Sequence, residues 1–325
     1  MSTADIAIKV KDLVKIYHPR SGEPVRALDG LTLQVRRGEI FGLLGRNGAG
    51  KTTLLRILTT LISPTSGEVS VLGLDVGQNS LAIRKQLCVV LQENAVELYL
   101  SVTDNLATYA RFHSVPRCEI PPRIDRAIEQ FGLTDHRNQK VIDLSGGLKR
   151  RVQVAKVFMV DKPLIFLDEA TTGMDPINKR TTLDAIREQA RAGRTIFLTT
   201  HILEEAEELC DTIAIIDRGR CIASGDLPKI KSLVSNAFDV TITFQSLSDI
   251  LLEEIRHLPL LKFSNYRTTI EATVRASDLS VLETLTRLAQ KEPVLHLEVR
   301  SATLEDVFLE ILGKPGEPSP AGKRP

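Results

Sequence analysis

Apolar and polar residues alternate in short runs at the start of the chain. The runs at 6–10 and 31–35, separated by a turn at 28–30, predict strands that bury one face. A third run at 40–44 leads into a glycine-rich loop. The apolar residues that follow the loop in the sequence predict a helix that ends before Ser63. The first part of the chain is therefore predicted to contain a strand, a loop and a helix in that order.

The middle of the chain changes from a polar helical pattern to dense apolar runs. Residues 101–151 are predicted to be helical, which indicates a helical subdomain, about 95–160, inserted into a mixed sheet. The runs 164–167 and 196–199 are densely apolar, as is typical of strands buried on both faces of a parallel sheet. Residues 178–192 between them are predicted to form a crossover helix, so the pattern predicts an α/β fold.

The pattern changes again after residue 225, where a second domain is expected. Its predicted elements are, in order, a strand at 238–244, a helix at 247–258, strands at 261–264 and 268–274, a helix at 279–290 and a strand at 294–299. That succession matches a split βαβ, ferredoxin-like unit, closed by a helix at 304–312. We therefore expect a large domain at 1–230, a small α+β domain at 231–312 and a disordered tail at 313–325.

The charges of the chain nearly cancel. Its 325 residues carry 42 Lys and Arg against 41 Asp and Glu, which leaves a formal charge of +1. A chain with nearly balanced charges does not produce the strong positive potential that non-specific nucleic-acid binding needs. No nucleic-acid partner is therefore expected. No run of about 18 apolar residues is present, and the N-terminal residues lack the apolar core of a signal peptide. A cytoplasmic location is therefore expected.

Residues 45–52 have the sequence Gly-Arg-Asn-Gly-Ala-Gly-Lys-Thr, which is the spacing of a phosphate-binding loop between a strand and a helix. Glycines allow successive backbone N–H groups to curl around phosphate oxygens. The helix N-terminus adds partial positive charge, Lys51 is expected to bridge the terminal phosphates, and the Thr52 hydroxyl is expected to bind Mg²⁺. We call residues 45–52 the phosphate loop.

The apolar run 164–167 ends in two acids, Asp168 and Glu169. A carboxylate at the end of a buried strand can reach the metal, so Asp168 is the expected metal ligand. A second carboxylate directly after it can polarise a water in line with the γ-phosphate, so Glu169 is the expected general base.

Five motifs occur in the order found in the ATP-binding cassette (ABC) ATPases, the nucleotide-binding subunits of ABC transporters. They are the phosphate loop, Leu144-Ser145-Gly146-Gly147, the strand ending in Asp168-Glu169, Gly173-Met174-Asp175, and Thr199-Thr200-His201. The chain resembles this family from residue 5 to about residue 230. The resemblance implies a P-loop NTPase domain of the ABC type, which binds ATP and Mg²⁺ and hydrolyses ATP.

The resemblance also implies roles that the residue pattern leaves open. Gln92 matches a glutamine that approaches Mg²⁺ and the attacking water, and His201 matches a histidine that contacts the γ-phosphate. Tyr17 matches an aromatic residue that stacks on adenine. Ser145 belongs to a loop that caps the γ-phosphate held by a second copy, and Asp175 matches an aspartate that communicates across the dimer. Taken singly, Ser145 would be an ordinary helix N-cap and Gln92 a surface residue.

The resemblance thus assigns three groups of residues. The implied catalytic residues are Lys51, Gln92, Glu169 and His201, and the implied metal ligands are Thr52, Gln92 and Asp168. The implied nucleotide-binding residues are Tyr17, Gly45, Asn47, Gly48, Ala49, Gly50, Lys51, Thr52, Thr53, Ser145, Gly146, Gly147 and Asp175.

Two positions depart from the family pattern. Leu148 stands where many members have glutamine, and Ala170 stands where proline usually follows the catalytic glutamate. Neither change removes a group that touches phosphate or metal, so we expect activity to survive. Because proline would fix φ, Ala170 is expected to affect the catalytic rate.

The pattern is most similar to the drug-resistance and ABC-2-type exporter ATPases. This resemblance rests on Gln92-Glu93-Asn94 and on the segments 100–106 and 304–309. It implies a homodimer that acts on a separately encoded membrane permease at the cytoplasmic face of the membrane. Two alternatives are a soluble ABC ATPase that acts on ribosomes or DNA, and a regulatory subunit that binds ATP without significant hydrolysis.

Overall fold

The computed structural model describes residues 5–19, 22–93, 95–233, 237–275, 278–301 and 303–313. The chain forms two compact units, which divide after Asp226. Within the described ranges, no helix is both long enough and apolar enough to cross a membrane. The predicted disordered tail lies, apart from Gly313, outside the described residues.

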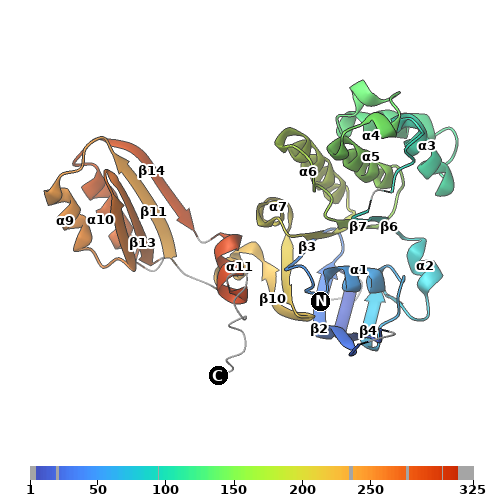
Figure 1. The fold of residues 1–325 in the computed structure, drawn as a ribbon, viewed down its shortest axis with the longest axis horizontal. Helices are drawn as coiled ribbons and strands as arrows, with labels where there is room; N and C mark the ends of the chain where they lie inside the picture. The colour runs from blue at the N-terminus through green and yellow to red at the C-terminus, as the bar shows by residue number, and fades with distance from the viewer. Residues whose placement is uncertain are drawn as a thin grey trace. The chain divides into compact units, whose positions relative to one another are not determined.

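The first unit is built on a six-stranded, mostly parallel sheet (Figure 1), with the strand order β10-β9-β3-β8-β7-β6. Its strands are β3 (Ile40–Gly45), β6 (Leu87–Val90), β7 (Leu164–Asp168), β8 (Thr195–Thr200), β9 (Thr212–Asp217) and β10 (Arg220–Asp226). Every residue of β7 and β8 is buried, as their unbroken apolar sequences predict. Because β3, β7 and β8 run parallel, their carboxyl ends meet at one edge of the sheet.

A second sheet of this unit is antiparallel, with the order β2-β1-β4-β5. Its strands are β1 (Ile6–Tyr17), β2 (Val25–Arg36), β4 (Ser66–Val71) and β5 (Leu74–Asp75). The predicted turn at 28–30 is wrong, because these residues lie inside β2, where Leu28 and Asp29 pair with β1 and Gly30 is the extra residue between two pairs. The register shifts there, and Gly30 has a φ of 72°, so the glycine accommodates a bulge and not a chain reversal.

Three helices form a helical subdomain beside the parallel sheet (Figure 1). They are α3 (Val102–Phe112), α4 (Ile120–Gln130) and α5 (Gly146–Phe158), and the remaining helices of the unit are α1 (Lys51–Leu58), α2 (Ser80–Arg84), α6 (Pro176–Arg191) and α7 (Leu203–Leu209). Asn105 of α3 is buried, and its side chain accepts from the backbone N–H of Glu97 at 2.8 Å and donates to the Glu97 carbonyl at 2.9 Å. These bonds tie the segment after Gln92 to the helical subdomain.

The second unit contains a four-stranded antiparallel sheet with the order β12-β13-β11-β14. Its elements are α8 (Leu227–Lys231), β11 (Ala237–Phe244), α9 (Asp249–Arg256), β12 (Lys262–Tyr266), β13 (Thr269–Arg275), α10 (Leu279–Ala289), β14 (Val294–Ser301) and α11 (Leu304–Leu312). Ile242 and Ile270 of the central strands form a core with Leu251 of α9 and Leu285 of α10. The succession and the strand order are those of the predicted ferredoxin-like unit.

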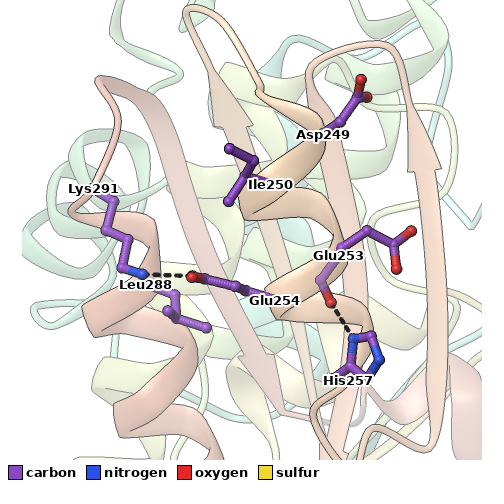
Figure 2. A pocket seen from close by; sticks show the side chains of 7 residues that line it. All are labelled: Asp249, Ile250, Glu253, Glu254, His257, Leu288 and Lys291. Atoms are coloured by element: carbon purple, nitrogen blue, oxygen red, sulfur yellow. Dashed lines mark hydrogen bonds and ion pairs between the residues drawn. The ribbon is translucent and has the colours of Figure 1, made fainter.

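An open hollow of about 800 Å³ lies between α9 and α10 (Figure 2). Lys291 forms an ion pair with Glu254 at 2.5 Å, and the His257 ring donates to the backbone carbonyl of Glu253 at 2.7 Å. None of the residues predicted to bind nucleotide or metal lies here, because all of them belong to the first unit.

Candidate functional site

The phosphate loop joins β3, which ends at Gly45, to α1, which begins at Lys51. Gly50 has a φ of 108°, and a Cβ on it would lie 2.7 Å from the carbonyl oxygen of Ala27. Both the backbone conformation and the close approach therefore require glycine. The N-terminus of α1 opens onto the loop, where its partial positive charge favours an anion.

The Lys51 side chain lies within the phosphate loop and is only 8% exposed. Its Nζ donates to the carbonyls of Gly45 at 2.6 Å and Arg46 at 3.2 Å. Burial lowers the pKa of Lys51, and the nearby carboxylates of Glu169 and Asp168 oppose that shift. The loop therefore holds a buried ammonium group at the position where the terminal phosphates are expected.

A hollow of about 320 Å³ opens at the phosphate loop. The predicted site residues that line it are Asn47, Gly48, Gly50, Lys51, Thr52, Thr53, Gln92, Asp168 and Glu169. Gly45 and Ala49 belong to the loop but are buried behind this surface. The fold therefore brings together residues that lie more than a hundred positions apart in the sequence.

The hollow contains a set of oxygen ligands that fits Mg²⁺. Thr52 provides a hydroxyl, Gln92 an amide and Asp168 a carboxylate, and Mg²⁺ prefers hard oxygen ligands. Asp168 is buried, and its Oδ1 accepts a hydrogen bond from the Thr199 hydroxyl on the neighbouring strand. This bond fixes the orientation of the carboxylate and leaves Oδ2 for a ligand.

The Glu169 carboxylate is held by side chains from two other loops. The His201 Nδ1 lies 2.9 Å from Oε1, and the Gln92 Nε2 donates to Oε2 at 3.3 Å. The backbone of Glu169 has a φ of 51°, a left-handed conformation that costs roughly 1 kcal/mol or more for a residue with a Cβ. Strain of this kind persists where the surrounding structure over-determines it. Here the backbone N–H of Glu169 donates to the carbonyl of Thr199 at 2.9 Å.

We call residues 144–147 the serine loop. Ser145 caps α5, because its Oγ accepts from the backbone N–H of Leu148 at 3.3 Å. Gly147 packs closely against the segment before α6, since a Cβ on it would lie 3.0 Å from the carbonyl oxygen of Gly173. No residue of the serine loop lines the hollow at the chain's own phosphate loop.

Three further predicted residues also do not line that hollow. His201 reaches it only through its contact with Glu169, and the other two are Asp175 and Tyr17. Asp175 caps α6 by accepting from the backbone N–H of Asn178 at 3.0 Å. Tyr17 ends β1, and the Nζ of Lys15 lies 5.2 Å from the centre of its ring. The structure thus does not place Tyr17 among the residues that line the phosphate hollow.

The comparisons with known proteins agree with this geometry. A family model described as ABC transporter matches residues 28–172. The daunorubicin resistance ATP-binding protein DrrA3 of Streptomyces coeruleorubidus is 33% identical over 95% of this chain and 97% of its own length. The chain belongs to the ABC transporter family. Nod factor export ATP-binding protein I of Neorhizobium galegae is 34% identical over 96% of this chain and 87% of its own.

Among solved structures, the ATP-binding subunit of an ABC transporter superposes with a TM-score of 0.63 and 29% identity. The match covers 70% of this chain and 92% of that subunit. Family and fold together make this chain an ATPase subunit of an ABC transporter.

The two departures from the ABC pattern leave the described contacts in place. Leu148 uses its backbone N–H, and not its side chain, to bond Ser145. Ala170 is 1% exposed, so its side chain is enclosed directly after Glu169. Neither substitution disturbs the contacts of His201 and Gln92 with Glu169.

Glu205 is a buried residue of this ABC ATPase that the sequence pattern does not single out. It is 2% exposed on α7, and its carboxylate accepts from the hydroxyls of Thr171 at 2.5 Å and Thr200 at 3.3 Å. Lys179 of α6 pairs with it at 2.9 Å. Glu205 thus connects the segment after Glu169 to the strand end before His201. In the sequence it is one of four glutamates on a short helix, so nothing local distinguishes it.

Replacing Glu205 with glutamine is expected to lower the free energy of unfolding by about 2–4 kcal/mol, because Lys179 loses its buried partner. ATP turnover is expected to fall as well, since the two segments that carry Glu169 and His201 lose a shared anchor. Glu204→Gln on the exposed side of the same helix is the control and should change stability by less than about 0.5 kcal/mol. Denaturant titrations and ATPase rates measure both effects. Equal effects of the two substitutions would contradict the assigned role.

Proposed function

We propose that two copies of this chain enclose two ATP molecules and that hydrolysis drives export through a separate membrane permease. The observation that carries the proposal is the convergence of Gln92 and His201 on Glu169 at the phosphate hollow. A strand-end acid with no catalytic role would not require contacts from two distant loops.

The predicted site residues at the hollow, together with His201 beside it, have chemical roles in hydrolysis. The phosphate loop and Lys51 bind the β- and γ-phosphates, and Glu169 accepts a proton from the attacking water. His201 orients the Glu169 carboxylate and contacts the γ-phosphate, while Gln92 positions the water. Thr52, Asp168 and Gln92 would hold Mg²⁺, which would supply positive charge to offset the charge that develops on the phosphate oxygens.

The position of the serine loop supports a dimer. Residues 144–147 do not line their own chain's phosphate hollow, so they reach a γ-phosphate only if that nucleotide is bound by another copy. A twofold-symmetric dimer forms two such sites, because each copy supplies the phosphate loop of one site and the serine loop of the other. Asp175 lies on the same side, since Gly147 packs against Gly173 in the adjoining segment.

Export and a permease are proposed from the relatives, which are named for daunorubicin resistance and for Nod factor export. The segment after Gln92 exposes two apolar side chains, Leu98 at 40% and Tyr99 at 76%. Exposed apolar side chains on this surface segment are suited to contact a membrane partner. In this arrangement the ATPase binds at the cytoplasmic face of the membrane.

Co-expression with a neighbouring gene product that has about six apolar spans tests the proposal. The chain should then sediment with membranes, and should remain in the supernatant when it is expressed alone. Tyr99→Ser should reduce membrane sedimentation without changing ATP binding, whereas Phe112→Ser, at an equally exposed aromatic residue of α3, is the control. A chain that stays in the supernatant in both cases would contradict the permease assignment.

A further inference from the structure

Arg150 on α5 is a buried cation whose guanidinium contacts two loops of the catalytic site. Its side chain is 5% exposed. Nη2 donates to the backbone carbonyl of Asp168, and to that of Glu169 at 3.0 Å. Nη1 donates to the carbonyl of Leu91 and to that of Gln92 at 3.5 Å.

A neighbouring side chain reinforces this arrangement. Gln153, one turn further along α5, accepts from Arg150 Nη1 at 2.9 Å. Its own Nε2 donates to the carbonyls of Leu91 at 3.0 Å and Glu93 at 2.8 Å. The backbone on both sides of Gln92 is therefore bonded to α5.

The charge of Arg150 also acts on the catalytic carboxylates. Burial lowers the pKa of Arg150, while Asp168 and Glu169 raise it again. An arginine remains charged under these conditions, because its ordinary pKa lies far above neutral pH. A fixed positive charge thus lies behind the two acids that the reaction uses, and it bonds the strained backbone of Glu169.

The other end of the same helix carries the serine loop. Ser145 is the N-cap of α5, so Ser145 and Arg150 are separated by about 7.5 Å of helix at a rise of 1.5 Å per residue. Both residues lie on one continuous helix. If α5 moves as a rigid body, a displacement of Ser145 therefore also displaces Arg150.

We propose that Arg150 is a positioning residue that transmits engagement of the serine loop by the partner's nucleotide to Gln92 and Glu169 of its own chain. ATP bound at one site then promotes hydrolysis at the other, which makes turnover cooperative in ATP. This inference rests on the proposed dimer. The geometric basis is the guanidinium fork, which holds the Gln92 loop and the Glu169 backbone to one helix.

Arg151 provides a matched control on the same helix. It is equally buried, at 5% exposure. Its Nη1 donates to the carbonyls of Phe131 at 2.9 Å and Gly132 at 3.2 Å, both within the helical subdomain. Arg151 therefore stabilises the subdomain without contacting Gln92 or Glu169 by hydrogen bonds.

The test compares Arg150→Lys with Arg151→Lys in the full-length chain. Lysine keeps the positive charge but lacks the guanidinium group that donates to two or more carbonyls at once. Both variants therefore lose the same kind of hydrogen bond. ATP turnover is measured against ATP concentration, and binding of ATP to monomeric chain is measured separately. We expect Arg150→Lys to reduce kcat roughly 10- to 100-fold and the Hill coefficient from about 2 toward about 1, with monomer affinity changed less than about twofold.

Arg151→Lys is expected to keep the wild-type Hill coefficient, whatever its effect on Tm. If both variants lose kcat and cooperativity equally, or if Arg150→Lys keeps both, Arg150 is only structural and the inference is overturned. A wild-type Hill coefficient of about 1 with active hydrolysis would overturn the relay but not the ATPase assignment. Wild-type protein without ATP turnover would instead overturn the proposed function.

Gln153→Leu gives a second variant if Arg150→Lys does not fold. It removes the bonds of Gln153 to Leu91, Glu93 and Arg150, and leaves Arg150 bonded to Leu91, Asp168 and Glu169. The Hill coefficient should fall while Mg-dependent hydrolysis persists. Unchanged cooperativity in folded Gln153→Leu would count against the relay through the Gln92 loop.

Discussion

Glu169→Gln is expected to lower ATP turnover by about 10²- to 10³-fold while ATP remains bound. The amide keeps the shape of the carboxylate but cannot accept the proton of the attacking water. His201 and Gln92 contact the Glu169 carboxylate at 2.9 and 3.3 Å. A glutamine can still accept from Gln92 through its oxygen and donate to His201 Nδ1 through its nitrogen, so the neighbouring loops should stay in place. The phosphate loop is unchanged, and the closed dimer should therefore accumulate with ATP trapped inside.

Single-turnover hydrolysis and size-exclusion chromatography with ATP and Mg²⁺ measure these two effects. The mutant should elute as a dimer with ATP and as a monomer without it, because closure needs the γ-phosphate. Glu204→Gln is the control, since Glu204 is exposed on α7 and is assigned no role in hydrolysis. Hydrolysis by Glu169→Gln at the wild-type rate would show that Glu169 is not the base. Absence of hydrolysis in the wild-type protein would favour a regulatory subunit that only binds ATP.

Mixing two inactive variants is expected to restore activity. Lys51→Ala removes the phosphate-binding ammonium, and Ser145→Arg blocks the serine loop, so each homodimer lacks two working sites. A mixed dimer has one site with an intact Lys51 from one chain and an intact Ser145 from the other. With equal amounts, half of the dimers are mixed and each has one site of two, so turnover should reach at most about a quarter of the wild-type rate. The rate should be lower still to the extent that hydrolysis at the intact site depends on ATP bound at the second site, but it should exceed that of the control mixture.

The control for this experiment combines both substitutions in one chain. When it is mixed with Lys51→Ala, no dimer has an intact phosphate loop, so no activity should appear. Full activity of Ser145→Arg alone would mean that the serine loop is not needed. A mixture that stays inactive, although both variants fold and dimerise, would contradict the assignment of the two half-sites to different chains.

Local patterns predict the elements of this protein where the chemistry is local. The buried runs of β7 and β8 follow from their apolar sequences, and the phosphate loop follows from glycines that permit the φ of Gly50. The ferredoxin-like order of the second unit also follows from the succession of its elements. The turn expected at 28–30 is not present. β2 pairs with β1 on both sides of Gly30, so the glycine lies at a bulge within the strand.

The sequence by itself determined the family and the residues with strong chemical types: a phosphate loop, paired acids at a strand end, and the serine loop. Only the tertiary structure decided that Gln92, Glu169 and His201 meet, because parallel strand order brings three distant loops to one edge of a sheet. The roles of Arg150 and Glu205 are likewise visible only in the tertiary structure. Arg150 bonds backbone carbonyls and Glu205 bonds threonine hydroxyls, and such groups are too common in any sequence to indicate which of them will be neighbours.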